Sequence, residues 1–331
     1  MVGFAGRYPA HRPRRMRQAA WVRDMVRETI LSPADLVWAM VVHAGREPRV
    51  PVAAMPGADR FSVEAAAEAA MEARRLGIPM IAIFPHVDPA LKDPVGTEAL
   101  NPNGLVPRAV RAMKAAAPEV GVMVDVALDP FTDHGHDGVL VGDTIANDET
   151  VLRLSQQALL LAKAGADVIA PSDMMDGRIG AIRDALEREG LNDVLILSYA
   201  AKYASAFYGP YREAIGVKTL RGDKKTYQMD PANTDEAIRE GALDVAEGAD
   251  MLMVKPGLAY LDIVHRLKAA FGLPTFAFQV SGEYAMIKAA AANGWLDEER
   301  AILETLTAFK RAGADGIVTY FAPRAAAMLR R

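Results

Sequence analysis

The chain has 331 residues, of which 51% are hydrophobic and 24% are charged, proportions that are ordinary for a globular protein. Its net charge of -4 argues against a polycation that binds nucleic acid, and the absence of cysteine excludes disulfides, thiolate metal sites and cysteine nucleophiles. Because no apolar run reaches the roughly 18 residues of a membrane-spanning helix and the N-terminus lacks a secretory hydrophobic segment, we expect a cytoplasmic protein without membrane contact.

The first predicted element is an arm over residues 1–36 that lies outside the main domain. Its first part is rich in arginine and poor in acids, so it could bind nucleic acid, act as a transit peptide or wrap a neighbouring subunit. Large apolar side chains alternate with the arginines and favour packing against protein, which predicts subunit contacts. The arginines are Arg7, Arg12, Arg14, Arg15, Arg17, Arg23 and Arg27, and the apolar residues are Phe4, Tyr8, Met16, Trp21 and Val22.

From residue 37 to residue 331, short apolar runs alternate with longer segments of helical spacing. This alternation predicts parallel βα units, and eight such units without a glycine-rich phosphate-binding turn favour a (β/α)₈ TIM barrel over an open doubly wound sheet. The expected strands are Val50–Ala54, Met80–Phe84, Val120–Leu128, Asp167–Ala170, Val194–Tyr199, Met251–Val254, Thr275–Val280 and Gly316–Phe321. The expected helices include Val63–Leu76, Arg108–Ala116, Glu149–Ala164, Asp235–Glu247 and Glu298–Arg311.

Two lysines stand where such a barrel places its chemistry, at the carboxyl ends of strands. Lys255 closes one apolar run, and Lys202 follows another run and two alanines. An ammonium group after core residues is costly unless the amine is neutral or paired, and a neutral lysine amine attacks carbonyls to form a Schiff base. Either lysine alone could merely cap a strand and reach solvent. Other strand ends add further polar groups, and together they predict a site: Asp125, Ser172, Asp173, Ser281 and Tyr320.

Four motifs give the chain a close resemblance to the porphobilinogen synthase (5-aminolevulinate dehydratase) family, from about Val52 to the C-terminus. The resemblance implies condensation of two 5-aminolevulinate molecules to porphobilinogen with loss of two waters, in tetrapyrrole (haem and chlorophyll) biosynthesis. It also implies one Schiff base for each substrate ketone, on Lys255 for the propionate side and on Lys202 for the acetate side. The motifs are Met251-Leu-Met-Val-Lys-Pro-Gly257, Ser198-Tyr-Ala-Ala-Lys-Tyr-Ala-Ser-Ala-Phe-Tyr-Gly-Pro-Tyr-Arg212, Ala170-Pro-Ser-Asp-Met-Met-Asp-Gly-Arg178 and Gln279-Val-Ser-Gly-Glu-Tyr284.

The same resemblance implies anchors for the two substrate carboxylates. Ser281 and Tyr320 match the propionate-side hydroxyls, and the acetate-side residues are Arg212, Lys224 and Gln228. For Lys224 and its neighbour Lys225 a solvated basic loop is the alternative.

Residues 203–228 resemble the family's active-site lid, which would close over the mouth and exclude water. Phe207 and Tyr208 belong to this lid and would contact substrate. Asp125 and Ser172 match polar positions beside the amine-bearing carbon, with satisfaction of buried backbone groups as their alternative role.

The chain departs from zinc-dependent relatives at the positions of their three metal-binding cysteines. Ala127, Asp129 and Asp137 stand there, and an alanine with two carboxylates is a poor zinc site. We therefore expect no catalytic zinc and no required cofactor, while Asp129 and Asp137 are available to magnesium, potassium or the substrate's ammonium group. The intervening Asp133, His134 and His136 are expected to form a solvated, hydrogen-bonded loop.

Glu240 matches a regulatory magnesium position of some relatives, although the guanidinium of Arg239 beside it could replace the cation. For assembly, the resemblance implies a hexamer or octamer of arm-exchanged dimers. Two other functions are less compatible with this sequence. A class I aldolase needs only one such lysine, and a nucleic-acid-binding protein would have to use the arm alone.

Overall fold

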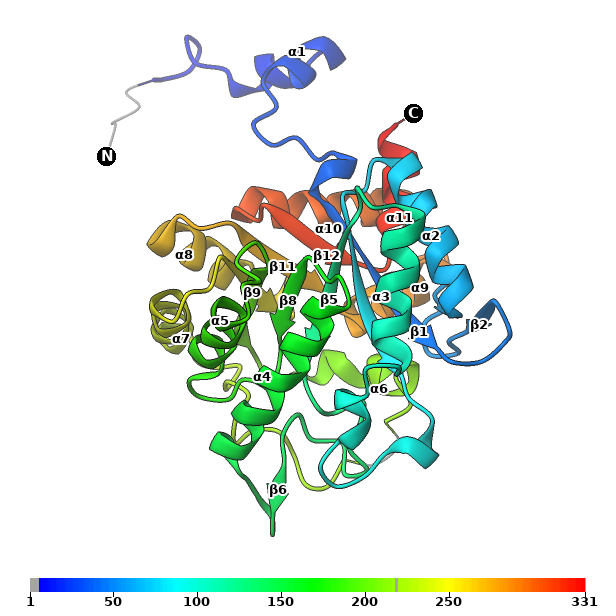
Figure 1. Cartoon of the computed structure of the whole chain (residues 1–331). Coiled ribbons are helices and arrows are strands. Elements are labelled where there is room, and N and C mark those ends of the chain that lie inside the picture. The colour runs from blue at the N-terminus through cyan, green and yellow to red at the C-terminus, as the bar shows by residue number, and fades with distance from the viewer. Residues whose placement is uncertain (1–5, 218–219, 331) are drawn as a thin grey trace.

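The computed structural model describes residues 6–217 and 220–330, and within them eight parallel strands close into a barrel (Figure 1). The strands follow one another around the ring in chain order, and the last pairs with the first to close it. The barrel strands are β1 (Leu36–His43), β4 (Met80–His86), β5 (Gly121–Val126), β8 (Val168–Pro171), β9 (Leu195–Lys202), β10 (Met251–Lys255), β11 (Thr275–Gln279) and β12 (Gly316–Thr319). The predicted TIM barrel is confirmed.

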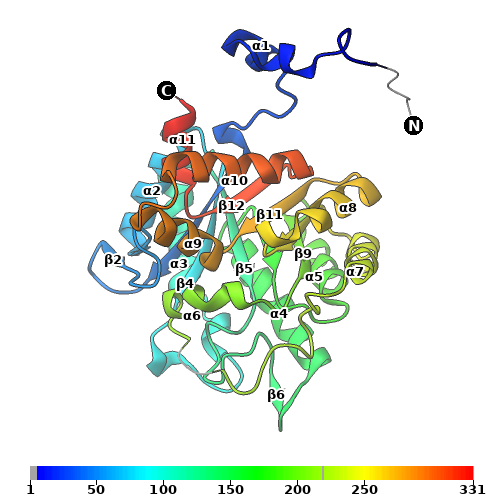
Figure 2. The same cartoon turned by 180° about the vertical axis from the view of Figure 1, so that it is seen from behind.

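Helices form the outer layer of the barrel and return the chain to the amino end of each next strand (Figure 2). Their apolar faces pack on the strands, and several end at a glycine in the left-handed conformation, as Gly313 ends α10. The helices are α2 (Val63–Leu76), α3 (Leu105–Ala116), α4 (Asn147–Lys163), α5 (Arg178–Arg188), α7 (Asp235–Ala246), α8 (Leu261–Phe271), α9 (Ser281–Ala292), α10 (Glu298–Ala312) and α11 (Ala322–Leu329).

The expected first barrel strand, Val50–Ala54, is wrong. The first strand is β1, which is buried at every position and is therefore apolar nearly throughout, as a parallel strand covered on both faces should be. Val50 lies instead in β2 (Arg49–Pro51), which pairs antiparallel with β3 (Asp59–Phe61) at the side of the barrel. The proline in β2 is typical of such an edge strand. The other seven expected strands overlap barrel strands.

The described part of the N-terminal arm extends away from the barrel (Figures 1 and 2). It contains η1 (Pro13–Arg17), α1 (Ala20–Met25) and η2 (Pro33–Asp35), and it enters β1 at the amino end of the barrel, opposite the mouth. Trp21 on α1 is 67% exposed in the single chain. Phe4 lies outside the described residues. The predicted subunit contacts of the arm stay a prediction.

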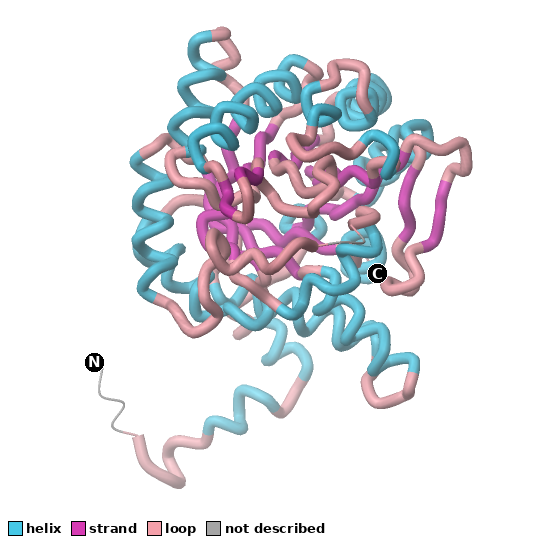
Figure 3. Tube along the Cα trace, turned by 90° about the horizontal axis from the view of Figure 1, so that it is seen from below, coloured by secondary structure: helices cyan, strands magenta, loops and turns pink. Residues whose placement is uncertain are grey.

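Long loops gather at the carboxyl end of the barrel, which we call the mouth (Figure 3, seen from this side). The loop after β5 contains the hairpin of β6 (Leu140–Val141) and β7 (Thr144–Ile145), and the segment after β9 contains η5 (Ala206–Tyr208) and α6 (Gly209–Ala214). Shorter 3₁₀ turns follow other strands: η3 (Pro89–Leu91), η4 (Thr97–Leu100) and η6 (Leu258–Tyr260). None of the described helices is both long and apolar enough to cross a membrane.

Candidate active site

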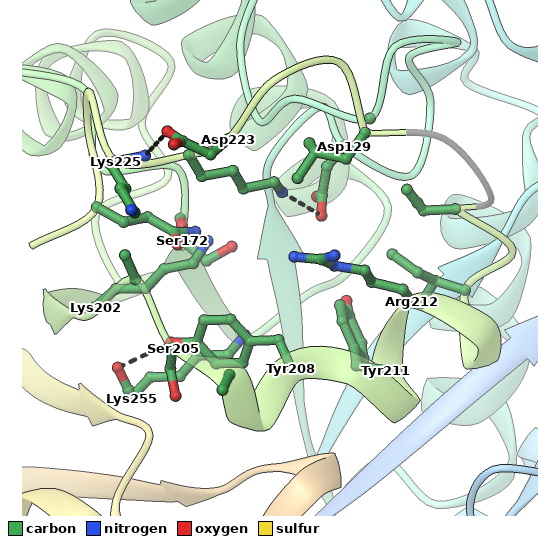
Figure 4. A pocket seen from close by; sticks show the side chains of 18 of the residues that line it. Asp129, Ser172, Lys202, Ser205, Tyr208, Tyr211, Arg212, Asp223, Lys225 and Lys255 are labelled. Atoms are coloured by element: carbon green, nitrogen blue, oxygen red, sulfur yellow. Dashed lines mark hydrogen bonds and ion pairs between the residues drawn. The ribbon is translucent and has the colours of Figure 1, made fainter. Parts of the chain in front are cut away.

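A cavity of about 270 Å³ opens at the mouth and contains both lysines (Figure 4). Lys255 ends β10 and Lys202 ends β9, and the parallel register places them directly opposite each other. Both are buried, so the alternative of strand caps that reach solvent does not hold. The predicted residues that line this cavity with them are Asp125, Asp129, Ser172, Tyr208, Arg212, Lys224 and Gln228.

Lys255 stands among aromatic rings. Its Nζ lies 4.9 Å from the ring centre of Phe278 and 5.1, 5.5 and 5.3 Å from those of Tyr199, Tyr208 and Tyr211. Among the described residues, no carboxylate lies within ion-pair distance of this amine. Burial, and then the charge of the neighbouring lysine, lower the pKa of Lys255 to about 8, against the pull of nearby aspartates.

Lys202 has ionic and polar partners instead. Its Nζ donates to Asp137 Oδ1 at 2.9 Å and to the carbonyl oxygen of Ser172. Burial by itself would raise the pKa of Asp137, but the ammonium groups of Lys202 and Lys224 together hold it far below its usual range. The two opposed lysines therefore differ in their resting environment, one apolar and one ionic.

Lys224 lies within reach of both Asp129 and Asp137. Its Nζ lies 3.2 Å from Asp129 Oδ2 and 2.7 Å from Asp137 Oδ2. Burial opposes its charge, yet the two carboxylates prevail and raise the pKa of Lys224. The solvated-loop alternative is thus wrong for Lys224, while Lys225 is exposed.

The donor set at these positions does not fit zinc. Ala127 offers no ligand, and the carboxylates of Asp129 and Asp137 already neutralise buried ammonium groups. The loop between them is also less open than expected, because His136 is buried and bonds the hydroxyl of Tyr227 at 3.0 Å. Across the described ranges, no group of three or more His, Cys, Asp or Glu side chains is placed to hold a metal ion.

Asp125 interacts electrostatically with both lysines. Burial raises its pKa to about 6, Lys255 pulls it down, and a hydrogen bond with Ser172 pulls in the same direction. Its Oδ1 is buried without a hydrogen-bond partner. A carboxyl of this pKa beside an amine of pKa about 8 can exchange protons near neutral pH.

The expected propionate-side residues lie behind the aromatic wall and do not line the cavity. Ser281 begins α9, and its Oγ accepts from the backbone N–H of Tyr211 at 2.9 Å and donates to the carbonyl of Phe207. Gly282 permits this approach, because a Cβ there would clash with the Phe207 backbone. The hydroxyl of Tyr320 is buried without a partner.

Residues 203–229, which include the expected lid, are fixed to the barrel by bonds to backbone carbonyls. The hydroxyl of Tyr208 donates to the carbonyl of Lys255 at 3.1 Å, and the backbone N–H of Met229 donates to the carbonyl of Lys202 at 3.0 Å. Arg60 donates to the last carbonyls of α6. Arg212, which α6 carries, points its guanidinium into the cavity near Asp129 (Figure 4).

Glu240 lies outside this cavity. It lines a second cavity of about 410 Å³ with Glu236, Asp143 and Asp176, beside the lid residue Lys225. Burial and then the charge of a nearby aspartate raise the pKa of Glu240.

Two residues around the cavity were not predicted from the sequence. Tyr199 faces Lys255 with a fully buried hydroxyl that has no partner, and Glu283 accepts backbone N–H groups from Val280 and Leu258, which joins the loops after β11 and β10. Both residues lie inside the motifs quoted above. Their contacts could not be predicted, because these depend on which way the side chains of a strand point and on loops that are distant in the sequence but adjacent in the fold.

Comparison with known proteins gives a consistent result. The family model described as delta-aminolevulinic acid dehydratase matches residues 10–328. A delta-aminolevulinic acid dehydratase of Bradyrhizobium diazoefficiens is 62% identical over 322 residues, 97% of this chain and 91% of that one. One of Rhodobacter capsulatus is 51% identical over 323 residues, 97% of each chain.

Among solved structures, the delta-aminolevulinic acid dehydratase (porphobilinogen synthase) of Toxoplasma gondii, in complex with the reaction product porphobilinogen, superimposes with a TM-score of 0.94. It is 50% identical in sequence, and the match covers 96% of this chain and 91% of that one.

Proposed function

The chain belongs to the delta-aminolevulinic acid dehydratase family, and we propose that it condenses two 5-aminolevulinate molecules to porphobilinogen through imines at Lys255 and Lys202. The observation that carries this proposal is the pair of buried lysines that stand opposite each other on β10 and β9 in one cavity. Two ketones call for two amines, and a single-lysine aldolase would have no use for the second.

Lys255 is the nucleophile that is ready at rest. With a pKa of about 8, about a tenth of the amine is neutral at a pH of about 7, so its Nζ can attack the ketone carbon of the first substrate. The carbon–nitrogen bond forms as the ketone oxygen leaves as water. Asp125, with a pKa of about 6, is placed to supply and take up protons beside it.

Lys202 holds the second substrate on the acetate side. Its ion pair with Asp137 keeps the amine in place, and it must give up a proton before it attacks. Lys255 has no such ion pair among the described residues, so its imine should form first, and the second imine then forms next to it.

The carboxylates of the two substrates have separate anchors. The acetate-side anchors are Arg212, Lys224 and Gln228. The ammonium group of Lys224 bonds two aspartates and has a third N–H donor for substrate. The hydroxyls of Ser281 and Tyr320 serve the propionate side, and for this Phe207 and Tyr211, whose backbone groups bond the Ser281 hydroxyl in the structure, have to move away from it.

Catalysis by this chain requires no zinc, because Lys224 supplies positive charge to Asp129 and Asp137 where a metal would stand in relatives. Magnesium or potassium at these aspartates would have to compete with that ammonium group, and Glu240 is the place for a regulatory magnesium. Enzyme dialysed against a strong chelator should keep most of its activity. A loss that zinc alone restores would contradict this proposal, and a loss that magnesium alone restores would indicate a magnesium site at Glu240 or at the two aspartates.

For assembly we propose a hexamer or octamer built from arm-exchanged dimers. The exposed aromatic and methionine side chains of the arm support this, Trp21 and Met25 among them. Deletion of residues 1–27 should give smaller particles in analytical ultracentrifugation, and an unchanged large oligomer would contradict it. We further propose a cytoplasmic location, which cell fractionation would test.

The direct test of the reaction is to incubate the purified protein with 5-aminolevulinate and follow the pyrrole product. Borohydride added during turnover should fix substrate on Lys255, and on Lys202 at least in part, as peptide mapping by mass would show. If neither lysine carries a substrate-derived mass, the imine mechanism is wrong.

A further inference from the structure

The strand that carries Lys202 contains a bulge just before the lysine. Between its pairing with Leu252 and its pairing with Val254, β9 takes three steps, from Ser198 to Ala201, where β10 takes two. Such an extra residue changes which face of the sheet the following side chains point to.

This change of phase matters for the active site. Side chains of a regular strand alternate, so Tyr199 and Lys202, three positions apart, would point to opposite faces. In the structure both point into the barrel, Tyr199 toward Lys255 and Lys202 into the cavity. Ser198 points outward, where its hydroxyl donates to Asp244 on α7.

A single buried guanidinium holds the bulge from outside. Arg178, the first residue of α5 and only 2% exposed, donates from Nη2 to the carbonyl of Tyr199 at 3.4 Å and to the hydroxyl of Ser198 at 3.3 Å. Asp244 accepts from both Nη atoms, at 3.1 and 3.3 Å, and so neutralises the charge. A bulge loosens the ladder of backbone hydrogen bonds, and these donors compensate for it.

The same guanidinium holds the loop that supplies the other partner of Lys202. Nη1 donates to the carbonyl of Met175 at 3.3 Å, and Nε lies 3.8 Å from Oδ2 of Asp173. Asp173 in turn accepts the N–H of Met175 at 2.7 Å. This loop begins at Ser172, whose carbonyl receives the Lys202 ammonium.

We propose that Arg178 is a positioning residue for Lys202: it fixes the bulge that turns the lysine into the barrel and the loop whose carbonyl receives its Nζ. The inference rests on the proposed imine at Lys202 and assigns no contact between Arg178 and substrate, because Arg178 does not line the cavity. Lys255 stands on a different strand, and Arg178 is not among the groups that surround its amine.

The matched comparison is Arg183, another partly buried arginine of the same helix. It donates to the carbonyls of Gly248 and Val194 and to Asp250, at the amino ends of the strands, away from the bulge. Arg178→Met and Arg183→Met thus remove the same charge from the same helix, the first beside the bulge and the second at the amino ends of the strands.

The test is borohydride trapping of the full-length protein during turnover of 5-aminolevulinate, with the substrate-derived label at each lysine measured by peptide mapping. In Arg178→Met the ratio of label at Lys202 to label at Lys255 should fall about tenfold or more, because a small misplacement of a reacting group is costly, and kcat should fall with it. Arg183→Met should leave the ratio unchanged. Arg178→Lys keeps the charge but loses the several N–H donors of the guanidinium, so its label ratio should lie between those of the two methionine variants.

A loss of stability without a positioning role would lower both labels together. An unchanged ratio in Arg178→Met would therefore overturn the inference. If that variant does not fold, Ser198→Ala decides in its place, because it removes one donor and acceptor of the network and should lower the ratio severalfold. Absence of label at Lys202 in the unaltered protein would overturn the proposed second imine, and this inference with it.

Discussion

The two halves of the mouth hold the same functional group in opposite surroundings. Lys255 stands among four aromatic rings without an ion-pair partner among the described residues, whereas Lys202 lies against Asp137 and a backbone carbonyl. The two residues are paired across neighbouring strands, so their difference comes from what surrounds each side chain and not from their place in the fold. An apolar wall favours the free amine, and an ionic partner favours the ammonium.

Each surrounding also has its own cost. The aromatic half leaves the hydroxyls of Tyr199 and Tyr320 buried without partners, which a folded chain tolerates rarely. The ionic half buries two ammonium groups around one aspartate and is stable only while that aspartate is charged. We infer that bound substrate supplies hydrogen-bond partners to the aromatic half, whereas the charged groups of the ionic half already have partners within the protein. Changes to either half test this contrast.

The largest effect is expected where the nucleophile itself is removed. Lys255→Ala should lower kcat by about a thousandfold or more while the protein remains folded, since no other amine among the described residues faces the aromatic wall and the covalent route is lost. Pyrrole formation and the midpoint of thermal unfolding are the measurements. Lys163→Ala, on the surface of α4, is the control and should change neither. Activity within about tenfold of the unaltered protein would show that Lys255 is not the imine-forming residue.

The next largest effect concerns the stability of the ionic half. Asp137→Asn leaves the buried Lys202 without a counterion, while Lys224 keeps Asp129, and breaking a buried pair in this way costs about 3–5 kcal/mol. Urea unfolding should show that loss, and the further change Lys202→Met, which removes the ammonium group left without a counterion, should restore part of it. Asp184→Asn, which breaks an exposed pair with Arg188, should have almost no effect. Equal stability of the Asp137 and Asp184 variants would mean that the cluster is held by other contacts.

A smaller effect is expected for the acetate-side carboxylate. Arg212→Ala removes one charge-assisted contact, worth roughly 1.5–3 kcal/mol, so the substrate concentration needed for the second site should rise about tenfold to a hundredfold. The first site should be little affected, which initial rates over a wide substrate range can resolve. Arg221→Ala is the control from the same lid, because its side chain pairs with Asp143 away from the cavity. An unchanged concentration dependence would remove Arg212 from the site.

The sequence predicted the lysine of each half but not the surroundings of either one. Alternating periodicity indicated the barrel, and the strand ends indicated both lysines and Asp125, because these depend on local pattern. The sequence did not reveal the bulge in β9, which changes the face to which the following side chains point. The inward position of Tyr199 was therefore missed. The pairing of Asp137 with Lys202 joins residues far apart in the chain, and only the closed barrel brings them together.

The first barrel strand, β1, was also absent from the strands expected from the sequence. The run from Leu36 to His43 follows the basic arm directly, and its unbroken apolar character is typical of a strand buried on both faces. The shorter run at Val50 is also apolar, but its first residues form one strand of the edge hairpin of β2 and β3. The unbroken run of β1 and the proline of β2 were signals in the sequence that separate the two, and the pairing of β1 with both β4 and β12 closes the ring.

The smallest effect tests whether the two halves act on each other. After burial, the charge of Lys202 is the main cause that lowers the pKa of Lys255. Lys202→Met removes this like charge, so the pKa of Lys255 should rise from about 8 toward its ordinary value of 10.5. Because the neutral amine is the reactive form, the rate of imine formation at Lys255 should then follow a pH curve displaced to higher pH. At pH of about 7 it should be slower, by less than about tenfold if the displacement stays under about one pH unit. The variant cannot complete the reaction, so the measurement is the rate of borohydride-trapped label at Lys255 as a function of pH, with Lys163→Met as the control. A curve that stays in place would show that the aromatic wall alone sets the reactivity of Lys255, and the two halves would then be electrostatically independent.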